Sequence, residues 1–93
     1  MMKHSEGPWK AEGPDEFGDY NIHEPGVRAV VAAVISNMRD PAEIEANARL
    51  IAAAPSLLAA CKDAAEWLSG RVSAEPYLSR IKAAVDKAEA KLQ

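Results

Sequence analysis

A proline inside an alanine-rich run sets the strongest limit on how this chain can fold. Residues 43–60 read EIEANARLIAAAPSLLAA, and Pro55 follows three consecutive alanines. A proline ring clashes with the preceding helical turn and disfavours the helical conformation at the residue before it. Because proline is also a favourable first residue of a helix, the run predicts two consecutive helices that meet at Pro55.

The first of these helices has a clear start. Asp40 is a typical N-cap residue and Pro41 suits the first helical position. Glu43 occupies the place of the acidic residue in a capping box. Glu45 and Arg49 have the i, i+4 spacing of a favourable ion pair on the helix surface.

The two sides of this helix differ in character. An apolar stripe runs along residues at helical spacing: Ile44, Ala48 and Ile51, flanked by Asn47 and Leu50. The opposite side carries small side chains: Ala42, Ala46 and Ala53. Alanine buries little apolar area, so a core rich in alanine is thin. We therefore expect a homo-oligomer that associates through this alanine face.

Two further apolar stripes follow Pro55. The first has i, i+3, i+4 spacing and ends before a C-cap expected at Gly70: Leu57, Leu58, Cys61, Ala64, Ala65 and Leu68. The second belongs to a helix that begins between Ser73 and Pro76: Tyr77 or Leu78, Ile81, Ala84 or Val85, Ala88 and Leu92. These patterns predict a helical part over residues 40–92.

The N-terminal part, residues 8–36, carries strand signals. Residues 8–11 suit a short edge strand because a proline at its start lacks a donor, and residues 19–23 alternate polar and apolar side chains. Residues 24–26, Glu-Pro-Gly, suit a type II turn. Residues 27–35 are β-branched and apolar on both faces after Arg28, which favours a strand over a helix and predicts the central strand of the sheet.

The expected fold is therefore α+β, with a small three-stranded antiparallel sheet packed by two or three C-terminal helices. At 93 residues the chain has the size of a single domain, 1–93, with residues 1–7 flexible. One cysteine, no apolar membrane-spanning stretch and no signal-peptide pattern indicate a cytoplasmic protein. The net charge of −3 without a basic cluster argues against binding of duplex nucleic acid.

No recognised catalytic, cofactor or metal motif is present, so we expect neither an enzyme nor a cofactor. His23 and Glu24 are better interpreted as an exposed pair at a strand end than as half of a metal site. Cys61 lies on an apolar stripe, which favours a buried structural role over a nucleophile. Asp15, Glu16 and Asp19 lack EF-hand spacing and predict a solvated turn.

Four residues are candidates for binding: Trp9, Arg28, Asn47 and Arg49. Each also has a structural interpretation. Trp9 can fix the N-terminus to the core, Asn47 can be a buried amide bonded to backbone, and Arg49 can pair with Glu45. Arg28, the charge in an apolar strand, lies either at the solvated end of that strand or beside an anion.

The stretch EANARLIAAAP, residues 45–55, followed by Leu57 and Leu58, resembles a group of small phage and prophage proteins. Members of this group typically begin with a Gly-Pro-Trp segment, here residues 7–9, and the resemblance covers most of residues 4–69. Residues 61–63, Cys-Lys-Asp, replace the Glu-Ala-Leu tract often seen there, and the C-terminal helix is outside the common pattern.

The resemblance implies a phage accessory protein, many of which antagonise host defence. We expect a protein that binds a host defence component, above all a CRISPR effector, and blocks it by steric occlusion. An oligomeric sponge that sequesters a cyclic nucleotide immune signal is the first alternative, with phosphate or base contacted by the four candidates named above. A virion or assembly factor is the second.

Overall fold

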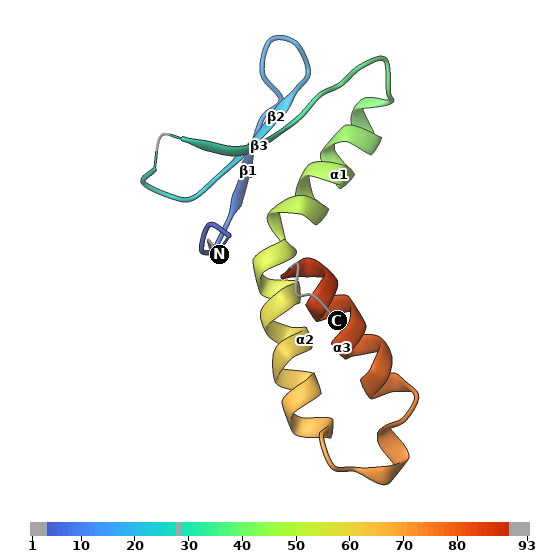
Figure 1. Cartoon of the computed structure of the whole chain (residues 1–93). Helices are drawn as coiled ribbons and strands as arrows, with labels where there is room; N and C mark the ends of the chain where they lie inside the picture. The colour runs from blue at the N-terminus through green and yellow to red at the C-terminus, as the bar shows by residue number, and fades with distance from the viewer. Residues whose placement is uncertain (1–3, 28, 90–93) are drawn as a thin grey trace. The chain divides into compact units, whose positions relative to one another are not determined.

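The computed structural model describes residues 4–27 and 29–89. Three strands precede three helices (Figure 1): β1 (Lys10–Glu12), β2 (Tyr20–His23), β3 (Val30–Val34), α1 (Pro41–Ala52), α2 (Ala54–Leu68) and α3 (Tyr77–Ala88), with a 3₁₀ turn at Val72–Ala74 before α3. The strands form one antiparallel sheet. The predicted α+β class is thereby confirmed. Arg28 and Leu92, both singled out above, lie outside the described residues.

The chain contains two compact units. One is Ser5–Pro55 and holds the sheet and α1, and the other holds the chain from Ser56 onward, with most of α2 and all of α3. The boundary coincides with the proline that separates the two predicted helices. The single domain expected over residues 1–93 stays a prediction.

The sheet is a meander with the order β1-β2-β3. Tyr20 lies opposite Val34 and Ile22 opposite Ala32, and an irregularity between Ile22 and His23 shifts the pairing so that His23 lies opposite Val30. The prediction of a central strand at 27–35 is wrong: β3 begins at Val30 and is an edge strand, while β2 is central. Valine and alanine occupy both faces of β3, but α1 covers only one of them, and Val30 stays about half exposed.

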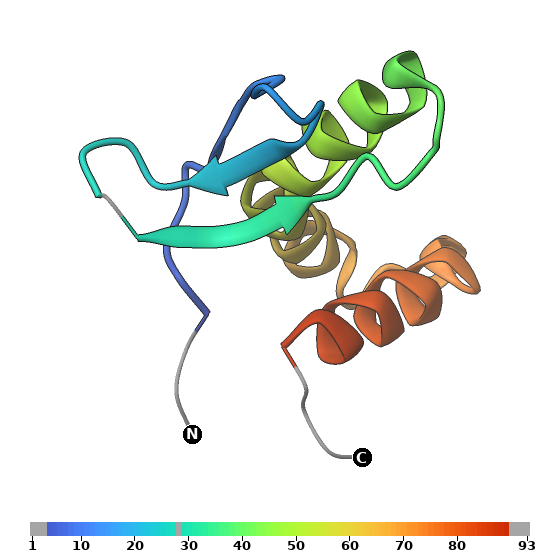
Figure 2. The same cartoon turned by 90° about the horizontal axis from the view of Figure 1, so that it is seen from above.

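The core of the Ser5–Pro55 unit lies between α1 and one face of the sheet (Figure 2). Its buried members are Ile22, Val34, Ile44 and Ala48. Partly buried side chains surround them: Trp9, Ala11, Tyr20, Ala32, Ile51 and Ala52. The predicted stripe of α1 therefore does face the sheet. Ala48 is fully buried, and its small side chain lets the helix backbone approach β2 closely.

At the start of α1 only the Asp40 half of the predicted capping box is present. Asp40 Oδ1 accepts a hydrogen bond of 2.8 Å from the backbone N–H of Ala42, and Pro41 is the first helical residue. The reciprocal half of a capping box is replaced by another contact, because the Glu43 carboxylate accepts from Arg39 at 2.6 Å. At the other end Ala53 interrupts the helix and α2 begins at Ala54, which confirms the break predicted from Pro55.

The second unit is built on α2 and α3. Gly70 adopts a φ of +84°, the left-handed conformation expected after a helix, and confirms the predicted C-cap. Leu78 and Val85 are the buried residues of α3, which places Leu78 rather than Tyr77 on its stripe. Within this unit Lys62 Nζ lies 2.9 Å from Glu89 Oε2. The apolar positions of α2 are half-buried at best, so this unit has a thinner core.

Ile44 should dominate the stability of the Ser5–Pro55 unit. Ile44→Ala leaves a cavity at a side chain that is 1% exposed, and we expect it to lower the free energy of unfolding by about 2–5 kcal/mol. Leu50→Ala on the same helix is the control, since a side chain that is 64% exposed should change it by less than about 0.5 kcal/mol. Urea denaturation followed by circular dichroism measures both, and equal losses would contradict the assignment of faces.

The Asp40 cap gives a second test. Asp40→Ala removes the acceptor of the Ala42 N–H and should cost about 0.5–2 kcal/mol. Asp40→Asn keeps a side-chain oxygen at the same place and should retain most of the stability. Thermal melts of the three proteins compare them, and an asparagine variant as unstable as the alanine variant would show that the cap acts through its charge.

Candidate binding groove

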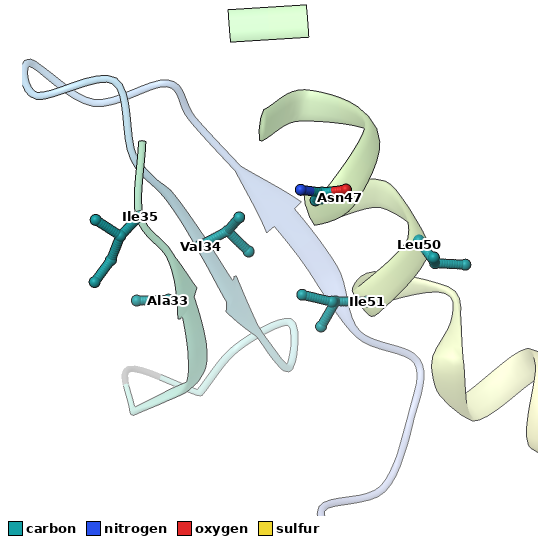
Figure 3. A pocket seen from close by; sticks show the side chains of 6 residues that line it. All are labelled: Ala33, Val34, Ile35, Asn47, Leu50 and Ile51. Atoms are coloured by element: carbon teal, nitrogen blue, oxygen red, sulfur yellow. The ribbon is translucent and has the colours of Figure 1, made fainter. Parts of the chain in front are cut away.

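An open groove lies between the end of β3 and α1 (Figure 3). It has a volume of about 450 Å³ and is lined by six residues: Ala33, Val34, Ile35, Asn47, Leu50 and Ile51. Five of them are apolar and none is charged. A groove of this composition favours apolar side chains and offers one amide for a hydrogen bond.

Helix and strand periodicity place these side chains. Val34 points toward α1 and Ile51 points toward the sheet, while Ala33 and Ile35 point to the other side of the strand (Figure 3). Leu50 lies one position before Ile51 and therefore points away from the sheet. Ile35 and Leu50 are each 64% exposed, so the rim of the groove presents large apolar side chains to solvent.

Asn47 is the polar side chain of the groove. It is exposed, and it makes no hydrogen bond within the described part of the chain. Its interpretation as a buried amide is therefore wrong. The reason is the placement of α1, which contacts β2 and β1 more extensively than β3, so the flank of the helix nearest β3 stays uncovered. The amide is available to a ligand or partner.

Trp9 and Arg49 make contacts outside the groove, and Arg28 lies outside the described residues. The Trp9 indole N–H donates to the carbonyls of Ser5 and Glu6 at 3.2 and 3.1 Å, and its ring packs against the core. Arg49 donates to Glu45 at 2.7 Å and is otherwise exposed. These contacts agree with the structural interpretation of both residues, and neither lines the groove.

The remaining polar residues singled out in the sequence have structural partners. His23 Nε2 lies 2.9 Å from Glu12 Oε1 across the sheet, without the geometry of an aligned hydrogen bond. Its carboxylate partner is thus Glu12 and not the adjacent Glu24. Asp15 Oδ1 accepts from the N–H groups of Phe17 and Asp19, which closes the loop before β2.

Cys61 is a free, half-buried thiol on α2. Over residues 4–27 and 29–89 no three His, Cys, Asp or Glu side chains come together as a metal site. Of the predicted assembly face, Ala42 and Ala46 are exposed and Ala53 is half-buried. Association through that face stays a prediction.

Sequence reasoning missed most of the groove. It named Asn47 but not Ala33, Ile35 or Leu50 as parts of one surface. The available signal was the projection of α1, which already put Asn47 and Leu50 together on one flank of the apolar stripe. The strand residues carried no such signal, because a strand assumed to be central has no free edge.

Comparison with known proteins identifies a family. A family model described as Salmonella phage P22 protein Y8K6 matches residues 1–92. No curated protein and no solved structure matches the chain. Within the described residues no single helix is long and apolar enough to cross a membrane, although α1 and α2 taken as a bent pair reach that length and composition.

The exposure of Asn47 leads to a prediction about stability. Asn47→Ala should change the free energy of unfolding by less than about 0.5 kcal/mol, because the amide has no partner to lose. A buried, bonded amide would instead cost about 1–3 kcal/mol on removal. Urea denaturation distinguishes the two, with Ile44→Ala as the reference for a buried position on the same helix.

Proposed function

This chain belongs to the family of Salmonella phage P22 protein Y8K6, and on that premise we propose that it is a non-enzymatic accessory protein that binds a host defence protein and blocks it. The expectation of a small phage protein is confirmed by the family. The view that the Gly-Pro-Trp start and the EANARLIAAAP stretch define such a group stays a prediction, as does the absence of enzymatic activity.

The observation that supports this proposal is the uncharged groove beside α1. Protein interfaces commonly centre on apolar side chains that enter a partner's pocket, with polar groups around them. The groove offers such a pocket, and Ile35 and Leu50 offer exposed apolar contacts at its rim. A host protein held there would be blocked by steric occlusion, with a CRISPR effector as the first target to test.

The same groove gives less support to the cyclic nucleotide alternative. Such a ligand carries phosphate groups, which proteins usually bind with arginine, lysine or clustered backbone N–H groups. None of the six lining residues is charged, and the described arginine candidate, Arg49, is paired with Glu45. A virion or assembly factor would also use a protein-binding groove, so the experiment has to separate it from the first proposal.

The test uses a host with an active CRISPR system challenged by a targeted phage. Expression of the chain should raise the plating efficiency of the phage. Leu50→Glu should weaken the effect, because a carboxylate buried without a partner costs more than the roughly 1.4 kcal/mol that reduces affinity tenfold. Leu57→Glu is the matched control, since Leu57 is 50% exposed on α2 and does not line the groove.

Purification of the tagged chain from infected cells identifies the partner. Recovery of a defence complex by the wild type and the Leu57→Glu variant, but not by Leu50→Glu, supports the proposal. Recovery of phage structural proteins with the same dependence supports a virion factor instead. Heat released by a cyclic di- or trinucleotide in calorimetry, together with unchanged plating in the CRISPR host, would favour the sponge.

A further inference from the structure

The Gly-Pro-Trp segment before β1 forms a tight loop that the proposed function does not use. The Trp9 indole N–H donates to the backbone carbonyls of Ser5 and Glu6, at 3.2 and 3.1 Å. The Trp9 ring packs against the core of the Ser5–Pro55 unit, and β1 begins at the next residue. Residues 5–9 therefore form a strap that is closed on itself and continues directly into the sheet.

The middle of the strap lies against the break between α1 and α2. A Cβ atom added at Gly7 would lie 2.6 Å from Pro55 Cβ and 3.2 Å from Pro55 Cγ, closer than packed carbon atoms approach. The proline ring cannot rotate away, because it is closed onto its own backbone. Gly7 also lies outside the left-handed region that the other four glycines occupy. Close approach to Pro55, and not backbone conformation, is therefore what requires glycine at this position.

Two stretches singled out in the sequence thus meet in space. Gly7 opens the Gly-Pro-Trp segment, and Pro55 ends the alanine-rich run. The last turn of α1, just before that proline, carries Ile51 and Ala52, which pack partly buried against the same core as Trp9. The core supports this turn from one side, and the strap lies just beyond its end.

We propose that the strap is a conformational device that holds the end of α1 in place, with Gly7 and Trp9 as its positioning residues. Trp9 anchors the strap in the core, and Gly7 lets its backbone lie directly on Pro55. The groove depends on this device, because Ile51 at the end of α1 is one of its lining residues. When the strap lifts, the last turn of α1 opens locally while the buried Ile44 one end away stays packed.

This inference goes beyond the proposed function and does not depend on it. All the contacts involved lie within the Ser5–Pro55 unit, and no host protein takes part in them. A chain that leaves phage plating unchanged can still have a working strap. Failure of the strap would likewise leave the proposal of a host target standing.

Residue-resolved hydrogen exchange of the full chain tests the strap. Gly7→Ala forces a Cβ atom against Pro55, and overpacking of this kind should speed exchange of the Ala52 and Ala53 amides about tenfold. The amides of residues 45–48 in the middle of α1 should change less than about twofold, because local opening leaves the core intact. A role in overall stability alone would instead speed exchange in both regions equally.

Two further variants frame this result. Glu6→Ala is the matched control, because it changes an exposed neighbouring side chain and should leave exchange as in the wild type. Trp9→Phe keeps an aromatic ring but removes the N–H that closes the strap, so it should also speed exchange at Ala52 and Ala53. Since it adds no atoms, it remains a test if Gly7→Ala does not fold.

A double-variant cycle assigns the effect to the contact between Gly7 and Pro55. Pro55→Gly removes the Cβ and the ring that the added Cβ would meet, so in that background Gly7→Ala should change exchange at Ala53 less than about twofold. An equal effect of Gly7→Ala in both backgrounds overturns the proposal. So does a uniform rise in exchange over the sheet and α1, or an end of α1 that neither Gly7→Ala nor Trp9→Phe affects.

Discussion

The contact of α1 with the central strand is the interaction on which the Ser5–Pro55 unit depends. Ile44 and Ala48 of the helix and Ile22 of β2 are almost completely buried, and Val34 of β3 completes the cluster. Ala48 allows close approach at the cost of apolar area. With so few large side chains buried, the free energy of unfolding of this unit is small. The hydrogen bonds at Asp40 and Asp15 therefore contribute a larger share of it than they would in a larger domain.

The position of α1 also creates the surface that we connect with function. The helix covers β2 and β1 and leaves the β3 side of the sheet open, so a groove forms where helix and edge strand diverge. Strand order, and not the position of the helix, makes β3 an edge strand. None of the six residues that line the groove proposed for a host protein is charged.

Local signals in the sequence predicted the elements well. Asp40-Pro41 marked the start of α1, Pro55 marked the break, and Gly26 and Gly70 marked a turn and a helix end, each for a reason contained in a few neighbouring residues. The errors concern relations between distant residues. The strand at 27–35 was expected in the centre because its composition is apolar on both faces, but strand order depends on which neighbours pair, and composition does not specify that. For Asn47 the sequence left a buried amide and a binding residue both open, because helical projection gives a flank without saying what lies opposite it.

The sequence by itself therefore determined the α+β class, the helix boundaries near Asp40 and Pro55, the core stripe of α1, and, through the family, a phage protein. Its local preferences act within a turn or two of chain, which is the range over which caps, prolines and periodicity operate. Only the tertiary structure decided that β2 is central, that Asn47 is exposed, and that Asn47 and Leu50 line one groove together with Ala33 and Ile35. The groove follows from how α1 packs across the sheet, a contact between separate segments for which the chain carries no local signal.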